Sequence, residues 1–257
     1  MCIRDSRYLS GFSGSAGVVV VTSKSAVLTT DGRYRTQSAE QVEAAGVAGS
    51  LDIAIGNAED QRAAVRAALV AASSARVGLE AESVTWAASR RWREIFDDAA
   101  EGVPASGVVE GLREVKDAGE LDRMARAAAI ADGALAEVLP MLAGVSATST
   151  LTEEEFALAL DTAMRRGGAE DRAFDTIVAA GPHSAKPHHQ PTETALRPGQ
   201  AVVVDFGATF CGYRSDMTRT FWLGGEPTGE MARVFQVVAD SQARGVAAVR
   251  ALSLIHI

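Results

Sequence analysis

Apolar and polar positions along the first part of the chain predict short strands that alternate with helices. The apolar runs at 16–21 and 26–30 flank the turn-prone sequence TSKS, a pattern typical of a β-hairpin. Further segments have the lengths and periodicities of regular elements, namely strands at 51–55 and 75–80 and helices at 33–46, 58–72 and 83–96. Because strand and helix alternate, we expect a small α/β domain over residues 7–112.

The second part of the chain, residues 113–252, begins with a long helix. Gly, Pro and charged residues are frequent at 101–121, which we interpret as the boundary region. Asp117 and Glu120 form a D-x-x-E capping pattern that begins the helix. Apolar residues at helical spacing predict its packed face, which comprises Leu121, Met124, Ala125, Ala128, Leu135, Val138, Leu139 and Leu142.

The remaining pattern predicts an α+β arrangement. A second capping pattern at 152–155 begins a helix that ends at the glycine pair 167–168. A strand at 174–181 and a hairpin at 202–221 follow, and the apolar periodicity of 230–252 predicts another helix.

Composition limits the class of protein. The 257 residues are 47% hydrophobic and 23% charged, as in soluble globular domains. A net charge of −8 argues against a nucleic-acid surface, which needs clustered Lys and Arg. No apolar run has the length that a bilayer span requires, so we expect no membrane partner. Cys2 and Cys211 alone make no disulfide framework, which predicts a cytoplasmic protein.

Both ends of the chain have an unusual composition. The segments MCIRDS and LSLIHI resemble translated sequencing-adapter remnants, and the tail carries no helix-capping signal. We therefore expect residues 1–6 and roughly 253–257 to be non-native and the chain to be a fragment.

The hairpin sequence VVVDFGATFCGYRSDMTRTF carries two aspartates, Asp205 and Asp216. A turn centred on Phe210 and Cys211 would place them directly opposite each other. A turn centred on Cys211 and Gly212 would make them diagonal neighbours on one face, and only an odd-length loop would separate their faces. The turn position therefore decides how close the two carboxylates lie.

Directly opposed carboxylates destabilise a sheet unless a positive group lies between them or one holds a proton. Arg214 and Arg219 are nearby candidates for that group. A divalent cation is a stronger one, because carboxylates are hard oxygen ligands. Spacing alone leaves open that Asp216 is an exposed strand residue or the partner of an arginine.

Several ordered segments carry a family resemblance. The hairpin motif resembles that of the pita-bread metallopeptidases, family M24, which includes methionine aminopeptidase, Xaa-Pro aminopeptidase and prolidase. The segment FDTIVAAGPHSAKPHH at 174–189 is similar to the family segment with a substrate-binding histidine. The stretches YLSGFSGSAGVVVV and LTTDGRY resemble the creatinase-type N-terminal domain of the Xaa-Pro branch. The resemblance implies an α/β creatinase-like domain followed by an incomplete α+β pita-bread domain.

The resemblance also implies roles for individual residues. Asp205 and Asp216 would be metal ligands, with Asp216 bridging two ions. His188 would hydrogen-bond the substrate and stabilise the tetrahedral intermediate, whereas on residue type alone it is an ordinary loop histidine. Thr218 and Thr220, on the face of Asp216, are weaker candidates for orienting its carboxylate, since threonine also simply favours strands. His183 and His189 have weaker claims than His188.

The implied activity is hydrolysis by a dinuclear site with Mn, Co, Zn or Fe. The substrate would be a peptide or dipeptide with proline at the second position, and the parent protein would be a homodimer. The family completes its site with a histidine and two glutamates on later strands, but only 41 residues follow Asp216. We therefore expect this chain by itself to have little metal affinity and no turnover.

Two other functions compete with the peptidase. One is a creatinase-like hydrolase of small C–N compounds that works without metal. Such an enzyme has no need of two neighbouring carboxylates. The other is a non-enzymatic protein that keeps the scaffold to bind a partner. The downstream sequence of the full-length gene would separate these functions, because the peptidase needs the later histidine and glutamates.

Overall fold

The computed structural model describes residues 3–250. The chain forms two compact units, Met1–Val115 and Lys116–Ile257. Of the ends that we expected to be non-native, residues 1–2 and 253–257 lie outside the described residues. The two units are described one at a time below.

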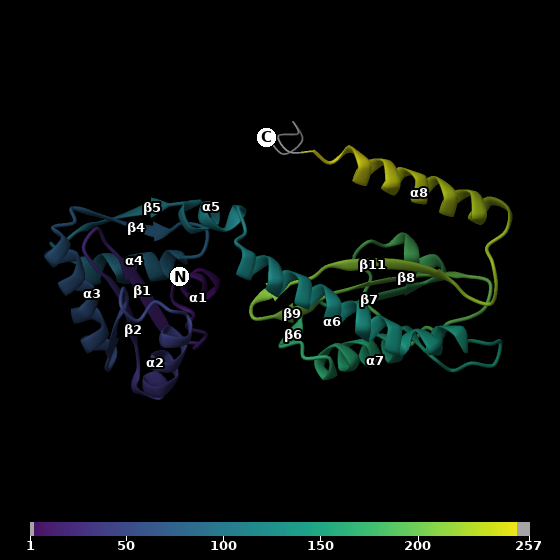
Figure 1. Ribbon diagram of the computed structural model, residues 1–257, viewed down its shortest axis with the longest axis horizontal. Coiled ribbons are helices and arrows are strands. Elements are labelled where there is room, and N and C mark those ends of the chain that lie inside the picture. Colours follow the sequence, from purple (N-terminus) through teal and green to yellow (C-terminus); the bar gives the residue numbers. More distant parts are fainter. Residues whose placement is uncertain (1–2, 251–257) are drawn as a thin grey trace. The chain divides into compact units, whose positions relative to one another are not determined.

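The first unit is an α/β unit with two small sheets (Figure 1). Its strands are β1 (Gly17–Val21), β2 (Ala26–Thr30), β3 (Asp52–Ile55), β4 (Arg76–Glu80) and β5 (Glu101–Ala105). Strands β1 and β2 form the predicted hairpin, β3 adds parallel to β2, and β4 pairs in parallel with β5. Its helices are α1 (Ile3–Ser10), α2 (Arg35–Ala44), α3 (Ala58–Ala72), α4 (Trp86–Phe96) and α5 (Val108–Glu114), with a 3₁₀ turn at Gly32–Tyr34.

Strand β5 and helix α5 lie within the stretch 101–121 that we interpreted as the boundary region. The two units divide between Val115 and Lys116, which also lie in this stretch. Strand β5 contains Pro104. It pairs only with β4 among the described strands, and an edge strand tolerates proline.

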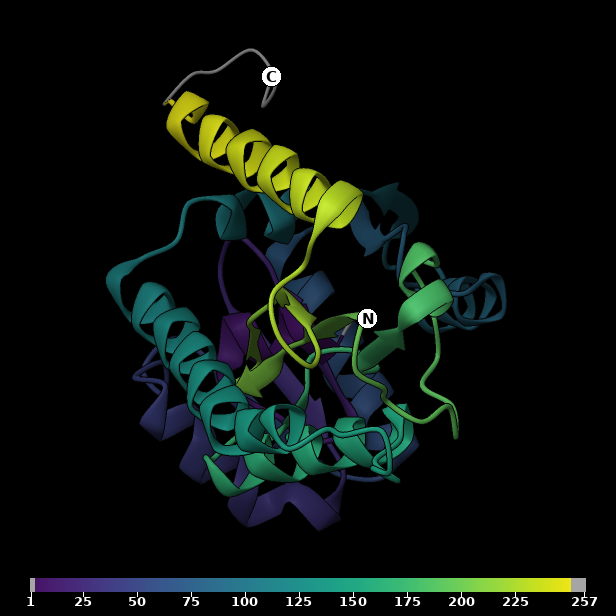
Figure 2. The same cartoon turned by 90° about the vertical axis from the view of Figure 1, so that its right-hand side faces the viewer.

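The second unit packs two helices against antiparallel sheets. Helices α6 (Ala118–Ala143) and α7 (Glu153–Arg166) lie together on one side of the strands (Figures 1 and 2). The main sheet has the order β11-β8-β7, with β7 (Ile177–Ala180), β8 (Ala201–Phe206) and β11 (Met217–Trp222). A smaller sheet has the order β10-β9-β6, with β6 (Asp171–Arg172), β9 (Ala208–Phe210) and β10 (Tyr213–Arg214). A 3₁₀ turn at Gly181–Ala185 follows β7, and helix α8 (Gly229–Ala248) follows β11.

Both predicted capping boxes form. The Asp117 Oδ1 atom accepts the backbone N–H of Glu120 at 2.7 Å, and Glu120 accepts that of Asp117 at 2.9 Å. Thr152 and Glu155 make the same reciprocal pair at the start of α7. These caps satisfy backbone donors that a helix start leaves without partners, and they fix where α6 and α7 begin.

The packed face of α6 differs from the predicted stripe. Leu121 is 55% exposed, and Met124 and Leu139 are more than a third exposed. The buried apolar residues are Ala127, Ile130, Ala131, Ala134, Val138 and Leu142, so only the last two of these were predicted. Three alanines on this face bring the helix close to β9 and β10, a packing that larger side chains would prevent.

The β8–β11 hairpin turns at Cys211 and Gly212, whose φ angles are +49° and +80°. Positive φ at both central residues is typical of a two-residue type I′ turn, and Gly212 adopts it readily. A turn at Phe210 and Cys211 would instead force a bulky aromatic residue to positive φ. The directly opposed arrangement of Asp205 and Asp216 was therefore wrong, because Asp205 pairs with Thr218. The diagonal alternative is the one that forms.

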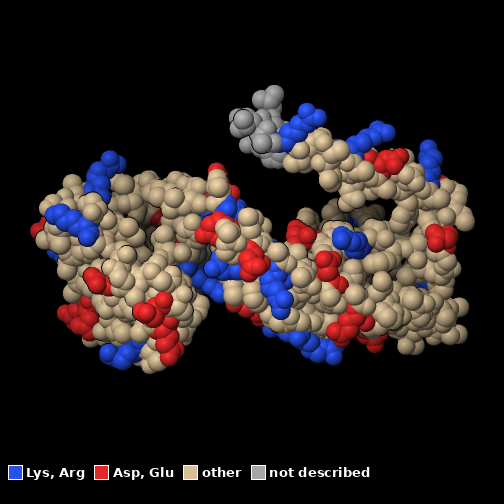
Figure 3. Space-filling view, in the orientation of Figure 1, with Lys and Arg blue, Asp and Glu red and all other residues tan. Residues whose placement is uncertain are grey.

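Basic and acidic side chains lie side by side over α6 and α7 (Figure 3). Arg166 of α7 pairs with Glu137 of α6, and Arg165 pairs with Asp171 of β6. All four side chains are half or more exposed, so each pair contributes little to stability.

Candidate functional site

The β8–β11 hairpin turns one face to the core and the other away from it. Val202, Val204 and Phe206 are fully buried in the core that includes α6 and α7. Asp205 alternates with them along β8, so its side chain lies on the opposite face. The Thr218 hydroxyl donates a hydrogen bond to Asp205 Oδ1 at 2.7 Å from directly across the sheet. One of the two predicted ligands is thus held in place by its cross-strand neighbour.

Asp216 lies just before β11, outside the strand where it was predicted, and is exposed. The register on both sides of it is continuous and places Asp216 across from Gly207, two positions from Asp205. The carboxylates are therefore diagonal neighbours on one face. Their mutual repulsion is weaker than for a directly opposed pair, so charge alone no longer demands a cation between them.

No arginine of the described part of the chain neutralises either carboxylate. Within residues 3–250, neither Asp205 nor Asp216 forms an ion pair with Lys or Arg. Arg219 instead donates to the carbonyl of Thr218 at 2.9 Å. Two hard oxygen ligands are thus available on one face of the hairpin, a donor set that suits divalent cations.

Gly207 and Ser215 set the path of the chain between the two aspartates. A Cβ atom on Gly207 would lie 2.0 Å from the carbonyl oxygen of Ser215, so only glycine fits there. The Ser215 hydroxyl accepts the backbone N–H of Ala208 at 2.9 Å and donates to the carbonyl of Ala127 on α6 at 3.2 Å. Helix α6 therefore anchors the residue that immediately precedes Asp216.

The two threonines that we proposed to orient Asp216 pair with other residues across the sheet. Thr218 bonds Asp205, as described above, and Thr220 lies across from Val203, farther from Asp216. Both are exposed. Of the two, Thr218 contacts a predicted ligand, but it contacts the other aspartate.

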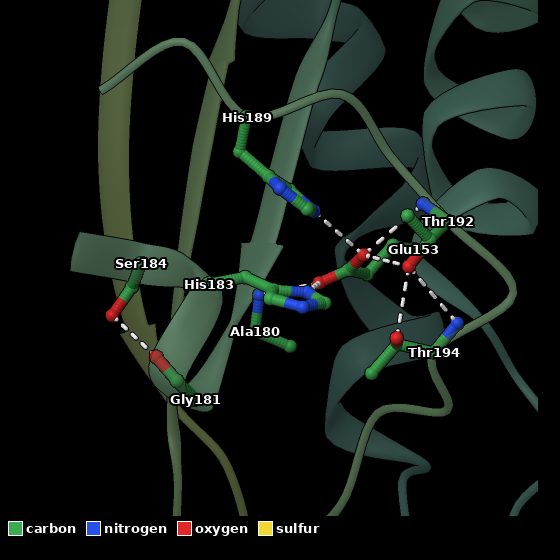
Figure 4. A network of polar contacts seen from close by, with 8 residues as sticks. All are labelled: Glu153, Ala180, Gly181, His183, Ser184, His189, Thr192 and Thr194. Carbon is green, nitrogen blue, oxygen red and sulfur yellow. Dashed lines mark hydrogen bonds and ion pairs between the residues drawn. The ribbon is translucent and has the colours of Figure 1, made fainter. Parts of the chain in front are cut away.

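A buried carboxylate organises the histidine-bearing loop that follows β7 (Figure 4). The Glu153 side chain, at the start of α7, has no exposed surface. Its Oε1 atom accepts the backbone N–H of Ala180 at 2.8 Å and lies 3.0 Å from His183 Nδ1. Its Oε2 atom lies 2.9 Å from His189 Nε2 and accepts the backbone N–H and hydroxyl of Thr192 at 3.1 and 2.7 Å. One side chain thus bonds four residues spread along 180–192.

The hydrogen bonds determine the charge state of the Glu153 carboxylate. Burial raises the pKa of Glu153, but the bonds from His189, Ala180, His183 and Thr192 outweigh burial and lower the pKa from 4.5 to about 2. An ionised carboxylate only accepts, so His183 must carry a proton on Nδ1 and His189 on Nε2. The two rings lie close together, with centroids 4.2 Å apart and planes tilted by 31° (Figure 4).

Glu153, His183 and His189 also have the composition of a metal site. Their ligand atoms lie within 4.8 Å of one another. However, each carboxylate oxygen already accepts at least two hydrogen bonds, and the two ring nitrogens that face it serve as donors. The cluster is therefore satisfied without an ion.

The sequence pattern did not reveal Glu153, and it gave His183 and His189 weaker claims than His188. His188, predicted to bind substrate, is exposed on the loop, whereas His189 is 93% buried against Glu153. The capping pattern located the helix start but not the direction of the Glu153 side chain. No local pattern links Glu153 to His183, 30 residues later, so only the tertiary fold brings them together.

No helix within residues 3–250 is both long and apolar enough to cross a bilayer.

Comparison with known proteins assigns both units. Residues 122–254 match the family model described as metallopeptidase family M24, and residues 4–115 match the Creatinase/Prolidase N-terminal domain. The chain is 36% identical to the uncharacterized peptidase YqhT of Bacillus subtilis over 95% of this chain and 65% of that protein. It is 35% identical to an Xaa-Pro dipeptidase of Pyrococcus furiosus over 56% of this chain and 39% of that protein.

Solved structures agree with this assignment. The Xaa-Pro dipeptidase from Bacillus anthracis superposes with a TM-score of 0.85 at 33% identity, covering 96% of this chain and 65% of that one. The X-Pro aminopeptidase from Thermotoga maritima gives 0.81 at 31% identity, covering 95% and 65%. The fold is therefore a creatinase-type α/β domain followed by a pita-bread α+β domain, and this chain spans about 65% of the length of these relatives.

Proposed function

We propose, from the premise that the chain belongs to metallopeptidase family M24 and carries a Creatinase/Prolidase N-terminal domain, that it is part of a metal-dependent peptidase. The peptidase would remove the residue that precedes proline from a peptide or dipeptide. Support comes from relatives whose names state Xaa-Pro dipeptidase or X-Pro aminopeptidase activity. The observation that carries the proposal is the location of Asp205 and Asp216 on the outer face of the β8–β11 hairpin, free of any arginine partner within residues 3–250.

The proposed site residues have three kinds of role. Asp205 and Asp216 would hold two divalent cations, of which Mn, Co, Zn and Fe are candidates, and Thr218 would keep the Asp205 carboxylate oriented. Such ions polarise a scissile carbonyl and lower the pKa of water. His188 is exposed and would donate a hydrogen bond to the substrate and to its tetrahedral intermediate.

The surroundings of the protein are also proposals. Cys211 is exposed and unpaired, which suits the reducing cytoplasm that we expect. The peptidase is proposed to be a homodimer, without nucleic-acid or membrane partners.

The alternatives make different use of the two carboxylates. A creatinase-like enzyme of this fold works without metal and has no role for a pair of acidic residues on one face. A binding protein that kept only the scaffold has none either. The paired aspartates therefore favour the peptidase over both.

Replacement of either aspartate tests the proposed function. In the longer protein, Asp205→Asn or Asp216→Asn should lower kcat/KM toward an Xaa-Pro dipeptide at least about 100-fold, because the amide loses the charge that holds a divalent ion. Asp132→Asn, an exposed aspartate of α6, is the matched control and should have no effect. Full activity in both site variants would refute the metallopeptidase.

Metal affinity of this chain tests the ligand count. Two carboxylates leave most coordination positions of two ions to water, so titration calorimetry with Mn²⁺ should show only weak binding, with Kd of about a millimolar or more. The heat of Mn²⁺ binding should disappear in the Asp205→Asn/Asp216→Asn double variant. Tight binding of two ions would mean that this chain supplies further ligands.

A further inference from the structure

The loop between β7 and β8 carries His188, and its anchors surround that residue. Ala180 and His183 hold the start of the loop to Glu153, and His189 and Thr192 hold its end. His189 is the residue next to His188 along the chain, and it is buried, whereas His188 is exposed. The backbone at His188 is thus held by a bond made one residue away.

The anchor is specific for a carboxylate. Five donors converge on two oxygen atoms, and none of the five groups is itself charged when both imidazoles are neutral. A glutamine at this position would present an N–H₂ group to at least two of these donors. The loop would then lose anchors on one side of His188 while the helix kept the same shape.

The anchored loop is also tied to the strand that carries Asp205. Ala180, which donates to Glu153, pairs with Val202 of β8, and Ile177 of β7 pairs with Asp205 itself. The backbone therefore connects the Glu153 cluster and the aspartate through one antiparallel strand pair.

We propose that Glu153 is a positioning residue for the peptidase, acting through His189 and the 181–192 loop to hold His188 against the substrate. This inference rests on the proposed function. It predicts that Glu153 never touches substrate, and that its effect on the reaction passes through His188. Loss of Glu153 should therefore lower kcat more than it changes KM, because a displaced His188 stabilises the transition state less.

A double-mutant cycle in the longer protein tests the coupling. His188→Ala should lower kcat about 100-fold and Glu153→Gln about 10-fold or more, while the double variant should be no worse than His188→Ala alone. Thr192→Val, which removes only one donor, should give a smaller loss of the same kind. Glu154→Gln is the control, because this neighbour on the same helical turn is exposed.

The outcomes separate the inference from the function on which it rests. Losses that multiply in the double variant would show that Glu153 acts independently of His188, and would overturn the positioning role while leaving the peptidase intact. No loss from His188→Ala would refute both the role of His188 and this inference. Activities are compared at a temperature at which each variant is folded, so that instability does not enter the rates.

A spectroscopic measurement on the chain itself provides the second readout. Long-range ¹H–¹⁵N correlation of the imidazoles should show the proton of His183 on Nδ1 and that of His189 on Nε2, and both signatures should change in Glu153→Gln. Addition of Zn²⁺ should leave them unchanged. If Zn²⁺ instead displaced the proton on His183 Nδ1 and the proton on His189 Nε2, the cluster would be a metal site and the inference would be overturned.

Discussion

Gly207→Ala should destabilise the second unit by about 3 kcal/mol, a large effect for the addition of one methyl group. The new Cβ would lie 2.0 Å from the carbonyl oxygen of Ser215 and 2.9 Å from its carbonyl carbon. Both are backbone atoms, so no side-chain rotation relieves the contact. The two strands would have to move apart at Gly207 and Ser215, between Asp205 and Asp216.

The tryptophans allow this effect to be assigned to one unit. Trp222 lies in β11, whereas Trp86 and Trp92 belong to α4 of the first unit. Urea titration followed by the indole NMR signals should show an earlier transition for Trp222 only, with the other two unchanged. Reading the units separately avoids assuming that the whole chain unfolds in one step.

Gly133→Ala is the matched control for this substitution. Gly133 is exposed in the middle of α6, and a Cβ there meets no atom within 4 Å. The same change should therefore stabilise the unit by about 0.5–1 kcal/mol, because alanine favours a helix more than glycine does. If Gly207→Ala left the Trp222 transition in place, the close approach to Ser215 would be refuted.

The hairpin shows which part of the site the sequence could determine. Alternation along 202–206 is sufficient to place Asp205 and Val204 on opposite faces, since side chains on a strand alternate whatever the turn. The register depends on where the turn lies, and the two turn residues must accept positive φ. The turn at Cys211 and Gly212 places Cys211, which is not a glycine, at positive φ. Turn chemistry left two positions open, and the directly opposed pairing was the wrong one.

Long-range contacts explain the other errors. The capping boxes of α6 and α7 were predicted correctly because a cap lies within four residues. The packed face of α6 was not predicted correctly, because alanines lie on several faces of the helix and make the helical pattern ambiguous. Contact with β9 determines which of these faces is buried. Glu153 is the extreme case: its partners lie 27 to 39 residues away, and the acidic run at 153–155 is typical of an ordinary exposed helix start.

Glu153→Gln should cost the second unit about 3 kcal/mol at neutral pH. A pKa lowered from 4.5 to about 2 means that folding favours the ionised carboxylate by roughly this amount. The variant keeps the size of the side chain but leaves buried donors facing an N–H₂ group, which is the costly way to break a buried network. The unfolding free energy from the Trp222 transition measures the loss, and Glu154→Gln should leave it unchanged.

The pH dependence of that loss identifies its origin. Because the pKa of Glu153 is lowered on folding, its contribution is complete above about pH 4.5 and is lost as the pH falls toward about 2. The difference in unfolding free energy between the wild-type chain and Glu153→Gln should therefore shrink across this window, whereas the difference for Glu154→Gln should stay near zero. A difference that persists unchanged at pH 2 would mean that the side chain stabilises the loop through its shape and not through its charge. The hydrogen-bonded carboxylate would then not be what holds the histidine loop.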